Sequence, residues 1–354
     1  MIELNMFSSA EKVKGQGVAS AYRELVNVID TQLRGKVNMT INKWRKADIT
    51  HYHTVDFQFF LSTFFSKNRG LKIGYVHFLP ETLEDSLKLP KPIRLLFNHY
   101  LIYFYKRMDE LIVVNPSFIP KLAAYGLKEE HIHYMPNFVS KKTFFPIRSD
   151  EEKRLLREKN QLLPDQFIVI GVGQVQYRKG VLDFIETARR LPNVRFIWVG
   201  GFSFGKITAG YDELKKIYEH PPENVRFTGI VEREKVNMYY QMADMLFLPS
   251  FNELFPMTIL EAMNCEIPLL LRDLDLYNSI LEGYYLKAAD IPAFVSIIEQ
   301  MQEDRNAYRQ AKQRAISGAA YYSEDKLANL WYEMYHRLLK ESSMHVKTHK
   351  TNAD

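Results

Sequence analysis

The chain of 354 residues contains a single cysteine, Cys265. One thiol cannot form an internal disulfide or a thiolate metal cluster, so a disulfide-stapled fold and a zinc-finger-like site are both excluded. The apolar, helix-like surroundings of Cys265 favour a small buried side chain over a reactive thiol. This cysteine usage is typical of a protein of the reducing cytosol.

Long apolar runs are absent as well. No stretch reaches the roughly 18 consecutive apolar residues of a transmembrane helix, and the N-terminus lacks the basic and apolar regions of a signal peptide. We expect a cytoplasmic protein that is bound peripherally to the inner face of the cell membrane. Nucleic-acid-binding motifs are also missing, so the net charge of +5 favours an anionic surface of another kind.

Strand-like and helix-like segments alternate along the chain, which predicts parallel β-sheets covered by helices. The strands expected in the N-terminal half span residues 2–7, 37–40, 49–53, 72–78, 110–114 and 131–135. The helices expected between them span residues 18–33, 55–66 and 93–108. A charged stretch at 141–164 interrupts the apolar rhythm, and a second alternating series begins at Phe167. The sequence thus predicts two domains joined by a linker in that stretch.

Two carboxylates, Glu253 and Glu261, follow the apolar run 245–250. The run predicts a buried parallel strand and helical spacing begins at Met257, so Glu253 falls in the loop and Glu261 falls inside the helix. Side chains at the carboxyl ends of parallel strands face the ligand crevice of an open α/β sheet. Two acceptor-only groups there suit the hydroxyls of a sugar or ribose. A pair of solvated surface charges is the alternative interpretation.

A second strand-like run, residues 167–173, ends in glycines and leads through Arg178, Lys179 and Gly180 into a predicted helix at 181–190. Glycines let the backbone approach a phosphate, and a helix N-terminus with two cations attracts an anion. The loop lacks the third glycine of a dinucleotide fingerprint, and the chain has no Walker lysine-serine pair. Taken alone, it is also consistent with a tight turn.

These segments together resemble glycosyltransferase family 4, the retaining, nucleotide-sugar-dependent enzymes of GT-B fold. The matching stretches follow the family's order, at residues 14–18, 48–53, 75–77, 135–139, 145–146, 173–180, 198–201, 224–229, 243–250 and 253–261. Gln174 is a departure, because the family often has arginine there. Within the family the chain is similar to Gram-positive bacterial glycolipid galactosyltransferases that act on glucosyl-diacylglycerol in lipoteichoic acid anchor synthesis. The segments 174–180 and 271–277 and the short N-terminal domain support this similarity.

The resemblance implies an α/β GT-B fold, with two Rossmann-like domains whose parallel sheets face a central cleft. We expect an acceptor-binding, membrane-facing domain at residues 1–145 and a nucleotide-sugar-binding domain at 146–322. A crossover helix at 323–341 and a disordered tail at 342–354 should follow.

The resemblance also implies the site residues. Lys179, with Arg178, is expected at the leaving diphosphate, Glu253 at donor-sugar hydroxyls, Glu261 at the ribose, and His77 across the cleft. The predicted donor-binding residues are Gly173, Gln174, Lys179, Glu253, Leu254, Phe255, Glu261 and Gly17. His53 and Gly15 are the predicted acceptor-side residues.

The predicted reaction moves a hexose, galactose by resemblance, from a UDP-sugar to a glycolipid such as glucosyl-diacylglycerol, giving an α-linked product. We expect no cofactor and no metal, because Lys179 supplies the charge and no third ligand accompanies Asp48 and the histidines near it. Three alternatives remain open. They are a glucosyltransferase acting on diacylglycerol, a transferase acting on a soluble or polyprenyl-linked glycan, and a catalytically inert partner of a transferase.

Residues 88–108 combine a dense aromatic and aliphatic run with flanking cations. Such a helix can lie in a bilayer interface, with its apolar side chains in the acyl boundary and its cations on anionic headgroups. A helix buried between the sheet and its neighbours is the alternative. The cations expected at the membrane are Lys88, Lys91, Arg94, Lys106 and Arg107.

Overall fold

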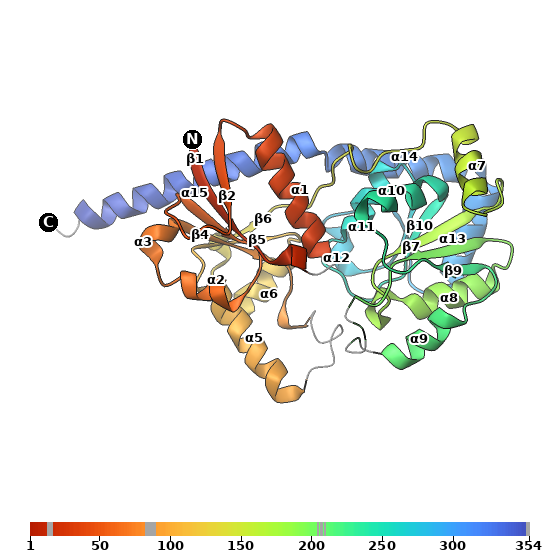
Figure 1. Ribbon diagram of the computed structural model, residues 1–354, viewed down its shortest axis with the longest axis horizontal. Coiled ribbons are helices and arrows are strands. Elements are labelled where there is room, and N and C mark those ends of the chain that lie inside the picture. Colours follow the sequence, from red (N-terminus) through yellow and green to blue (C-terminus); the bar gives the residue numbers. More distant parts are fainter. Residues whose placement is uncertain (13–16, 82–89, 204, 206–207, 209, 352–354) are drawn as a thin grey trace.

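The computed structural model describes residues 1–12, 17–81, 90–203, 205, 208 and 210–351, and two parallel six-stranded sheets form its framework (Figure 1). The first sheet has the strand order β2-β1-β3-β4-β5-β6, and the second has the order β12-β11-β10-β7-β8-β9. The strands of the first sheet are β1 Ile2–Phe7, β2 Val37–Ile41, β3 Ile49–Tyr52, β4 Leu71–Val76, β5 Glu110–Val113 and β6 Ile132–Tyr134. Those of the second are β7 Ile168–Val172, β8 Arg195–Val199, β9 Val225–Phe227, β10 Met245–Leu248, β11 Leu269–Arg272 and β12 Leu286–Ala288. The predicted α/β class is confirmed.

The central strands are buried along their whole length, as the apolar runs predict. β4, β7 and β10 have no exposed residue, because helices cover both faces of a parallel sheet. The helices beside the first sheet are α1 Gly17–Gln32, α2 Phe57–Ser62, α3 Ser66–Arg69, α5 Lys91–Lys106 and α6 Phe118–Ala124. Those beside the second are α7 Asp150–Lys159, α8 Val181–Arg190, α9 Tyr211–Glu219, α10 Arg233–Met242, α11 Met257–Asn264, α12 Asp275–Asn278, α13 Ile291–Glu303 and α14 Arg305–Tyr321.

The helix predicted at 55–66 is shorter in the structure, because α2 covers Phe57–Ser62 and α3 begins only at Ser66. The hydroxyls of Ser62 and Thr63 bond back to the carbonyls of Phe59 and Phe60, at 2.6 and 2.7 Å. Such local side-chain bonds compete with helix continuation, and α2 ends at Ser62.

The predicted linker is also shorter than expected. Ser149 caps α7 by accepting from the backbone N–H of Glu152. Lys153 and Arg157 then fix α7 to Asp244, just before β10, with contacts of 2.6 and 2.7 Å. The charges at 150–159 thus anchor a helix of the second half, and the connection between the halves lies before it.

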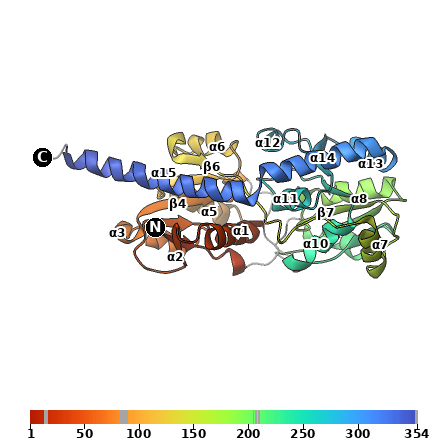
Figure 2. The same ribbon diagram turned by 90° about the horizontal axis from the view of Figure 1, so that it is seen from above.

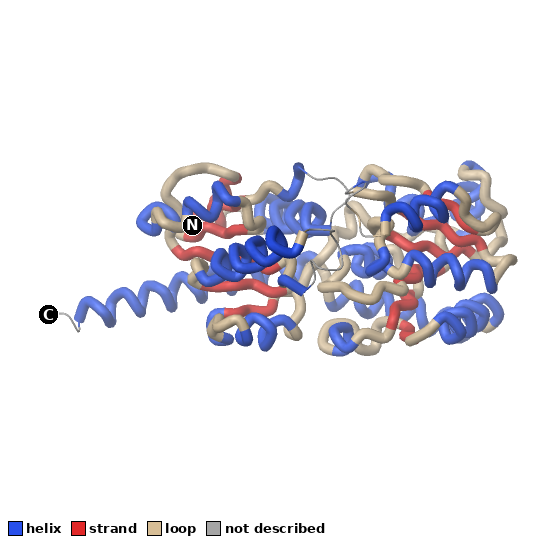
Figure 3. The backbone as a smooth tube through the Cα atoms, turned by 90° about the horizontal axis from the view of Figure 1, so that it is seen from below, coloured by secondary structure: helices blue, strands red, loops and turns tan. Residues whose placement is uncertain are grey.

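The last helix, α15 Glu324–Thr351, returns along the first sheet's half of the molecule (Figures 2 and 3). Its buried Trp331 lies 6.0 Å from Tyr75, and the hydroxyl of Tyr335 lies 3.0 Å from Nδ1 of His51. The prediction of a disordered tail from residue 342 differs from the structure, in which α15 continues to Thr351. Residues 352–354 lie outside the described residues.

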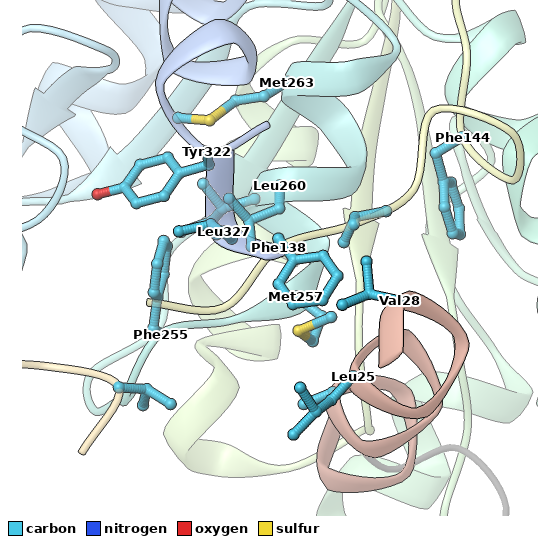
Figure 4. Packing of buried hydrophobic residues seen from close by; sticks show 14 of the residues in the cluster. Leu25, Val28, Phe138, Phe144, Phe255, Met257, Leu260, Met263, Tyr322 and Leu327 are labelled. Carbon is cyan, nitrogen blue, oxygen red and sulfur yellow. The ribbon is translucent and has the colours of Figure 1, made fainter. Parts of the chain in front are cut away.

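One hydrophobic cluster contains buried residues of both halves (Figure 4). Leu25 and Val28 of α1 face Met257 and Leu260 of α11, with Phe138 beside them. The cluster packs α1 of the first half against α11 of the second half and so fixes the two halves relative to each other. Cys265 is buried, as its surroundings predict.

Candidate active site

A cavity of about 860 Å³ opens between the two halves. It lies at the carboxyl ends of β7 and β10, where an open parallel sheet binds its ligands. The predicted residues that line it are Gly17, His77, Gly173, Gln174, Arg178, Lys179, Glu253, Leu254, Phe255 and Glu261. His53 does not line it. Gly15 lies outside the described residues.

Lys179 and Glu253 form the central ion pair of this cavity. The Lys179 Nζ atom lies 2.5 Å from Oε1 of Glu253, and Arg178 Nη1 lies 3.7 Å from its Oε2. Burial alone would raise the pKa of Glu253, but the two cations outweigh it and hold that pKa below its usual value. Burial lowers the pKa of Lys179, and Glu253 opposes that effect. Two cations facing one carboxylate leave one positive charge in excess, which suits an anionic ligand.

Glycine backbone conformations bring these groups together. Gly180 follows Lys179 with φ of 69°, and a Cβ atom there would lie 2.1 Å from the carbonyl oxygen of Pro249. The loop between β7 and α8 therefore approaches the loop after β10 closely at this position. The carbonyl of Gly173 accepts from the Trp198 indole at 3.0 Å, which fixes the end of β7.

Glu261 lies inside α11, as its spacing from Met257 predicts, and is held by two donors. Arg233 Nη1 contacts its Oε1 at 2.7 Å, and the Tyr240 hydroxyl donates to its Oε2 at 2.8 Å. The same guanidinium also contacts Glu24 of α1, in the first half, at 2.6 Å from Nη2. Burial raises the pKa of Glu24, although Arg233 opposes this.

Three histidines of the first half, His51, His53 and His77, lie together at the cavity. His77 lines the cavity, and its Nε2 lies 2.8 Å from Nδ1 of His53. His53 is fully buried, so the structure separates this predicted acceptor residue from the cavity. Burial lowers the pKa of His77 to about 3, and burial with the charge of His77 lowers that of His51 to about 3. Both are therefore neutral at pH 7.

The prediction missed further polar residues in and around the site, and four of them hold its loops and carboxylates in place. Asn115 donates to the carbonyls of Leu254 and Leu276 at 3.2 and 3.0 Å, and Asn137 donates to that of Phe255 at 3.1 Å. Arg233 and Glu24 are the other two. Asn115 stands two residues beyond the end of β5, so the argument from strand ends that selected Glu253 could have found it.

The described residues contain no group of three or more His, Cys, Asp or Glu side chains placed to hold a metal ion. Independence from metal stays a prediction.

The helix α5 is buried on one side only, so the alternative of a fully buried helix is wrong. Leu101, Phe104 and Tyr105 pack inward, while Leu95 and Leu96 are 60% and 73% exposed. We call the exposed side chains on α2, α5 and the turn after α2 the apolar face. It comprises Phe57, Leu61, Phe64, Phe65, Ile93, Leu95, Leu96 and Tyr103.

The cations predicted at the membrane differ in position. Lys91 and Lys106 are exposed at the two ends of α5, and Arg94 is half-buried. Arg107 is held by the protein, since its Nη2 donates to the Thr63 carbonyl at 3.0 Å and its guanidinium lies over the Phe64 ring. Lys88 lies outside the described residues. Across the described ranges, none of the helices combines the length and the apolar character needed to cross a membrane.

Comparison with known proteins gives consistent results. Residues 152–318 match the family model described as "Glycosyl transferases group 1". The chain is 48% identical over 336 residues to "Alpha-galactosylglucosyldiacylglycerol synthase" of Streptococcus pneumoniae, covering 95% of this chain and 90% of the relative. It is 29% identical to "Processive diacylglycerol alpha-glucosyltransferase" of Acholeplasma laidlawii, covering 60% of this chain and 68% of that protein.

Solved structures share the fold at low identity. Sucrose-phosphate synthase of Thermosynechococcus elongatus aligns with a TM-score of 0.76 and 16% identity, covering 96% of this chain and all of that one. Anabaena HepE in complex with UDP-glucose aligns with a TM-score of 0.73 and 15% identity, covering 95% of this chain and 100% of that one. These alignments confirm the predicted GT-B fold. The 48% identity over nearly the whole chain and the matching family model establish that the protein belongs to the group 1 family of glycosyl transferases, as its sequence motifs indicate.

Proposed function

We propose that the protein transfers galactose from UDP-galactose to glucosyl-diacylglycerol and forms an α-linked diglycosyl-diacylglycerol. The observation that carries this proposal is the 48% identity, over 95% of the chain, to a protein named for that product. A relative named for glucosyl transfer to diacylglycerol supports the lipid class of the acceptor. The cavity between the two halves supports a two-substrate reaction, because each half supplies one wall.

Lys179 and Arg178 would bind the diphosphate of the donor. Their one excess positive charge over Glu253 lies where negative charge develops on the departing nucleotide. Preorganised charge of this kind stabilises a transition state more than a ground state. Gln174, which replaces the family's frequent arginine, would add a neutral donor beside them. With this residue set we expect the transfer to proceed without a metal.

Glu253 would accept hydroxyls of the donor hexose, and Glu261 would accept those of the ribose. A carboxylate has about four lone-pair sites. Lys179 engages one oxygen of Glu253, so capacity for hydroxyl donors remains. Because Nε2 of His77 is bonded to His53, we assign its Nδ1 atom to the hexose. The acceptor hydroxyl would enter from the first half and attack from the side of the leaving group, without a protein nucleophile.

The apolar face would dock the enzyme on the membrane that holds its lipid acceptor. Single exposed apolar residues are ordinary, but this face gathers eight large ones on neighbouring elements of the same half. Contacts between α2 and α5, such as Phe60 with Tyr103 at 5.6 Å, join them into one surface. Lys91 and Lys106 at the ends of α5 would meet anionic headgroups.

The decisive experiment offers radiolabelled UDP-galactose and UDP-glucose in parallel, each with glucosyl-diacylglycerol and with diacylglycerol. We expect label to enter lipid in the reaction of UDP-galactose with glucosyl-diacylglycerol. Preferential labelling from UDP-glucose would assign the protein to glucosyl transfer instead. If neither lipid is labelled although the protein still binds UDP, the proposal that the acceptor is one of these lipids is wrong.

A further inference from the structure

A buried charge cluster bridges the two halves at one wall of the cavity. It consists of Glu24 from α1, Arg233 from the start of α10 and Glu261 from α11. Arg233 contacts the carboxylates through different nitrogens, Nη2 to Glu24 at 2.6 Å and Nη1 to Glu261 at 2.7 Å. The side chains of the two glutamates are 5% and 4% exposed.

Arg233 is itself held in place. Its guanidinium lies over the ring of the buried Phe144, 4.9 Å from the centroid, and Nη1 also contacts the Ser20 hydroxyl at 2.9 Å. A lysine could not reproduce this arrangement, because one ammonium is a point charge and a planar guanidinium presents a fixed fork of donors. The geometry therefore requires arginine to join the two carboxylates.

The cluster leaves Glu261 able to bind a further donor. Arg233 engages one of its oxygens and Tyr240 the other, and each oxygen keeps acceptor capacity toward the cavity. Glu261 and Arg233 line the cavity, whereas Glu24 does not. Glu24 is anchored on its other oxygen by the Ser140 backbone N–H at 3.1 Å.

We propose that Arg233 is a positioning residue that holds Glu261 in its ribose-binding orientation and couples it, through Glu24, to α1 of the acceptor half. This inference rests on the proposed function, in which Glu261 binds the ribose. It makes nucleotide affinity in one half depend on a buried residue of the other half. Coupling of this kind is reciprocal, so bound nucleotide should also strengthen the contact between the halves.

The test measures UDP binding by isothermal titration calorimetry for wild type, Glu24→Gln, Arg233→Lys and the double variant. We expect Glu24→Gln to weaken UDP binding by about 5-fold or more, the lower end of typical coupling between sites. Arg233→Lys should weaken it at least as much. Glu24→Gln should add almost nothing in the Arg233→Lys background, because its effect passes through that guanidinium.

The matched control is Glu3→Gln, which removes an exposed carboxylate of the same half that is paired with Arg45. It should bind UDP as wild type does. Thermal unfolding with and without UDP gives a second readout, in which Glu24→Gln should reduce the stabilisation that UDP provides. Wild-type affinity in Glu24→Gln, or additive effects in the double variant, would overturn the coupling. If Arg233→Lys binds UDP more tightly than wild type does, Arg233 obstructs the ribose site and does not support it.

A further variant separates this inference from the function beneath it. Glu261→Gln should weaken UDP binding if the ribose lies there. If Glu261→Gln binds UDP as wild type does, the ribose placement fails. If it weakens binding while Glu24→Gln does not, only the coupling through Arg233 fails.

Discussion

At the scale of single residues, the site is organised by incomplete charge compensation. Arg178 and Lys179 together face one carboxylate, whereas Arg233 alone faces two. The excess charge is thus positive at the end of β7, where a diphosphate would bind, and negative at α11, where hydroxyls would donate. One cavity can in this way receive the two chemically different parts of a nucleotide sugar.

We expect Lys179→Ala and Glu253→Ala each to lower kcat by on the order of 100-fold or more, because each removes one preorganised electrostatic contact. Initial rates with saturating UDP-galactose measure the effect, and circular dichroism melting separates it from unfolding. Lys215→Ala is the matched control, since Lys215 forms an exposed pair with Glu219 on α9. Turnover close to wild type in either site variant would remove that residue from the mechanism.

The buried histidines predict a dependence of stability on pH. Burial lowers the pKa of His51 and His77 to about 3, far below the value of about 6.5 in an unfolded chain. Below pH 6.5 the unfolded state takes up protons that the folded state excludes. The contribution of the neutral, buried histidines to the free energy of unfolding is therefore fully present above pH 6.5. It is lost as the pH falls toward 3. The slope is up to about 1.4 kcal/mol per pH unit for each histidine.

Chemical denaturation at several values between pH 6.5 and pH 4.5 measures that slope. We expect His51→Asn to flatten it, because an amide does not titrate. His220→Asn, which removes an exposed histidine of the other half, should keep the wild-type slope. Equal slopes in wild type and His51→Asn would show that His51 does not contribute.

At the scale of secondary structure, α5 serves two environments. Its inward side chains complete the core of the first half, and its outward ones, with those of α2, form the apolar face. The exposed apolar side of such a helix is stabilised when it is buried in a second apolar environment, such as a bilayer interface. The proposed environment is the membrane.

We expect Leu95→Ser with Leu96→Ser to weaken binding to phosphatidylglycerol liposomes by about tenfold or more, since fully burying one leucine contributes roughly 1.5–3 kcal/mol. Lys91→Gln with Lys106→Gln should weaken it less and make the remaining binding less sensitive to salt. Flotation assays measure both effects. Lys215→Gln with Lys235→Gln, which removes two exposed lysines of the second half, is the control. If the leucine variant floats as wild type does, the apolar face is not the docking surface.

At the scale of the whole molecule, α1, α11 and α15 hold the two halves together around the cavity. α15 begins beside the second half and packs on the first, and the shared hydrophobic cluster joins residues of both halves. The two walls of the cavity are therefore held in a fixed relative orientation, which transfer between two bound substrates requires.

We expect the purified protein to form an α-linked product in the presence of excess EDTA. The α linkage follows from the retaining family resemblance, and Lys179 with Arg178 supplies the charge that a metal would otherwise provide. Proton NMR of the new anomeric centre measures the linkage, and initial rates with and without EDTA measure the metal requirement. A β-linked product would contradict the retaining mechanism, and activity restored only by added divalent ions would contradict the charge assignment.

The sequence by itself determined what depends on neighbours along the chain. Apolar runs alternating with helical spacing predicted both sheets, and the interval from Glu253 to Glu261 placed one carboxylate in a loop and the other in α11. These features are local, because strand and helix periods act over a few residues. The resemblance of ordered motifs then indicated which strand ends would share one cleft.

The tertiary structure decided which distant groups meet. Glu24 and Arg233 are 209 residues apart in the chain, and no local pattern pairs them. His53 is fully buried, with the rings of Tyr22 and Tyr75 packed against it, whereas His77 lines the cavity. From the sequence, the charged residues of α7 are interpreted as part of a linker. In the structure two of them pair with Asp244 and fix α7 to the second half. In each case a contact across the fold gave the residue its role, because charge and burial depend on the three-dimensional surroundings.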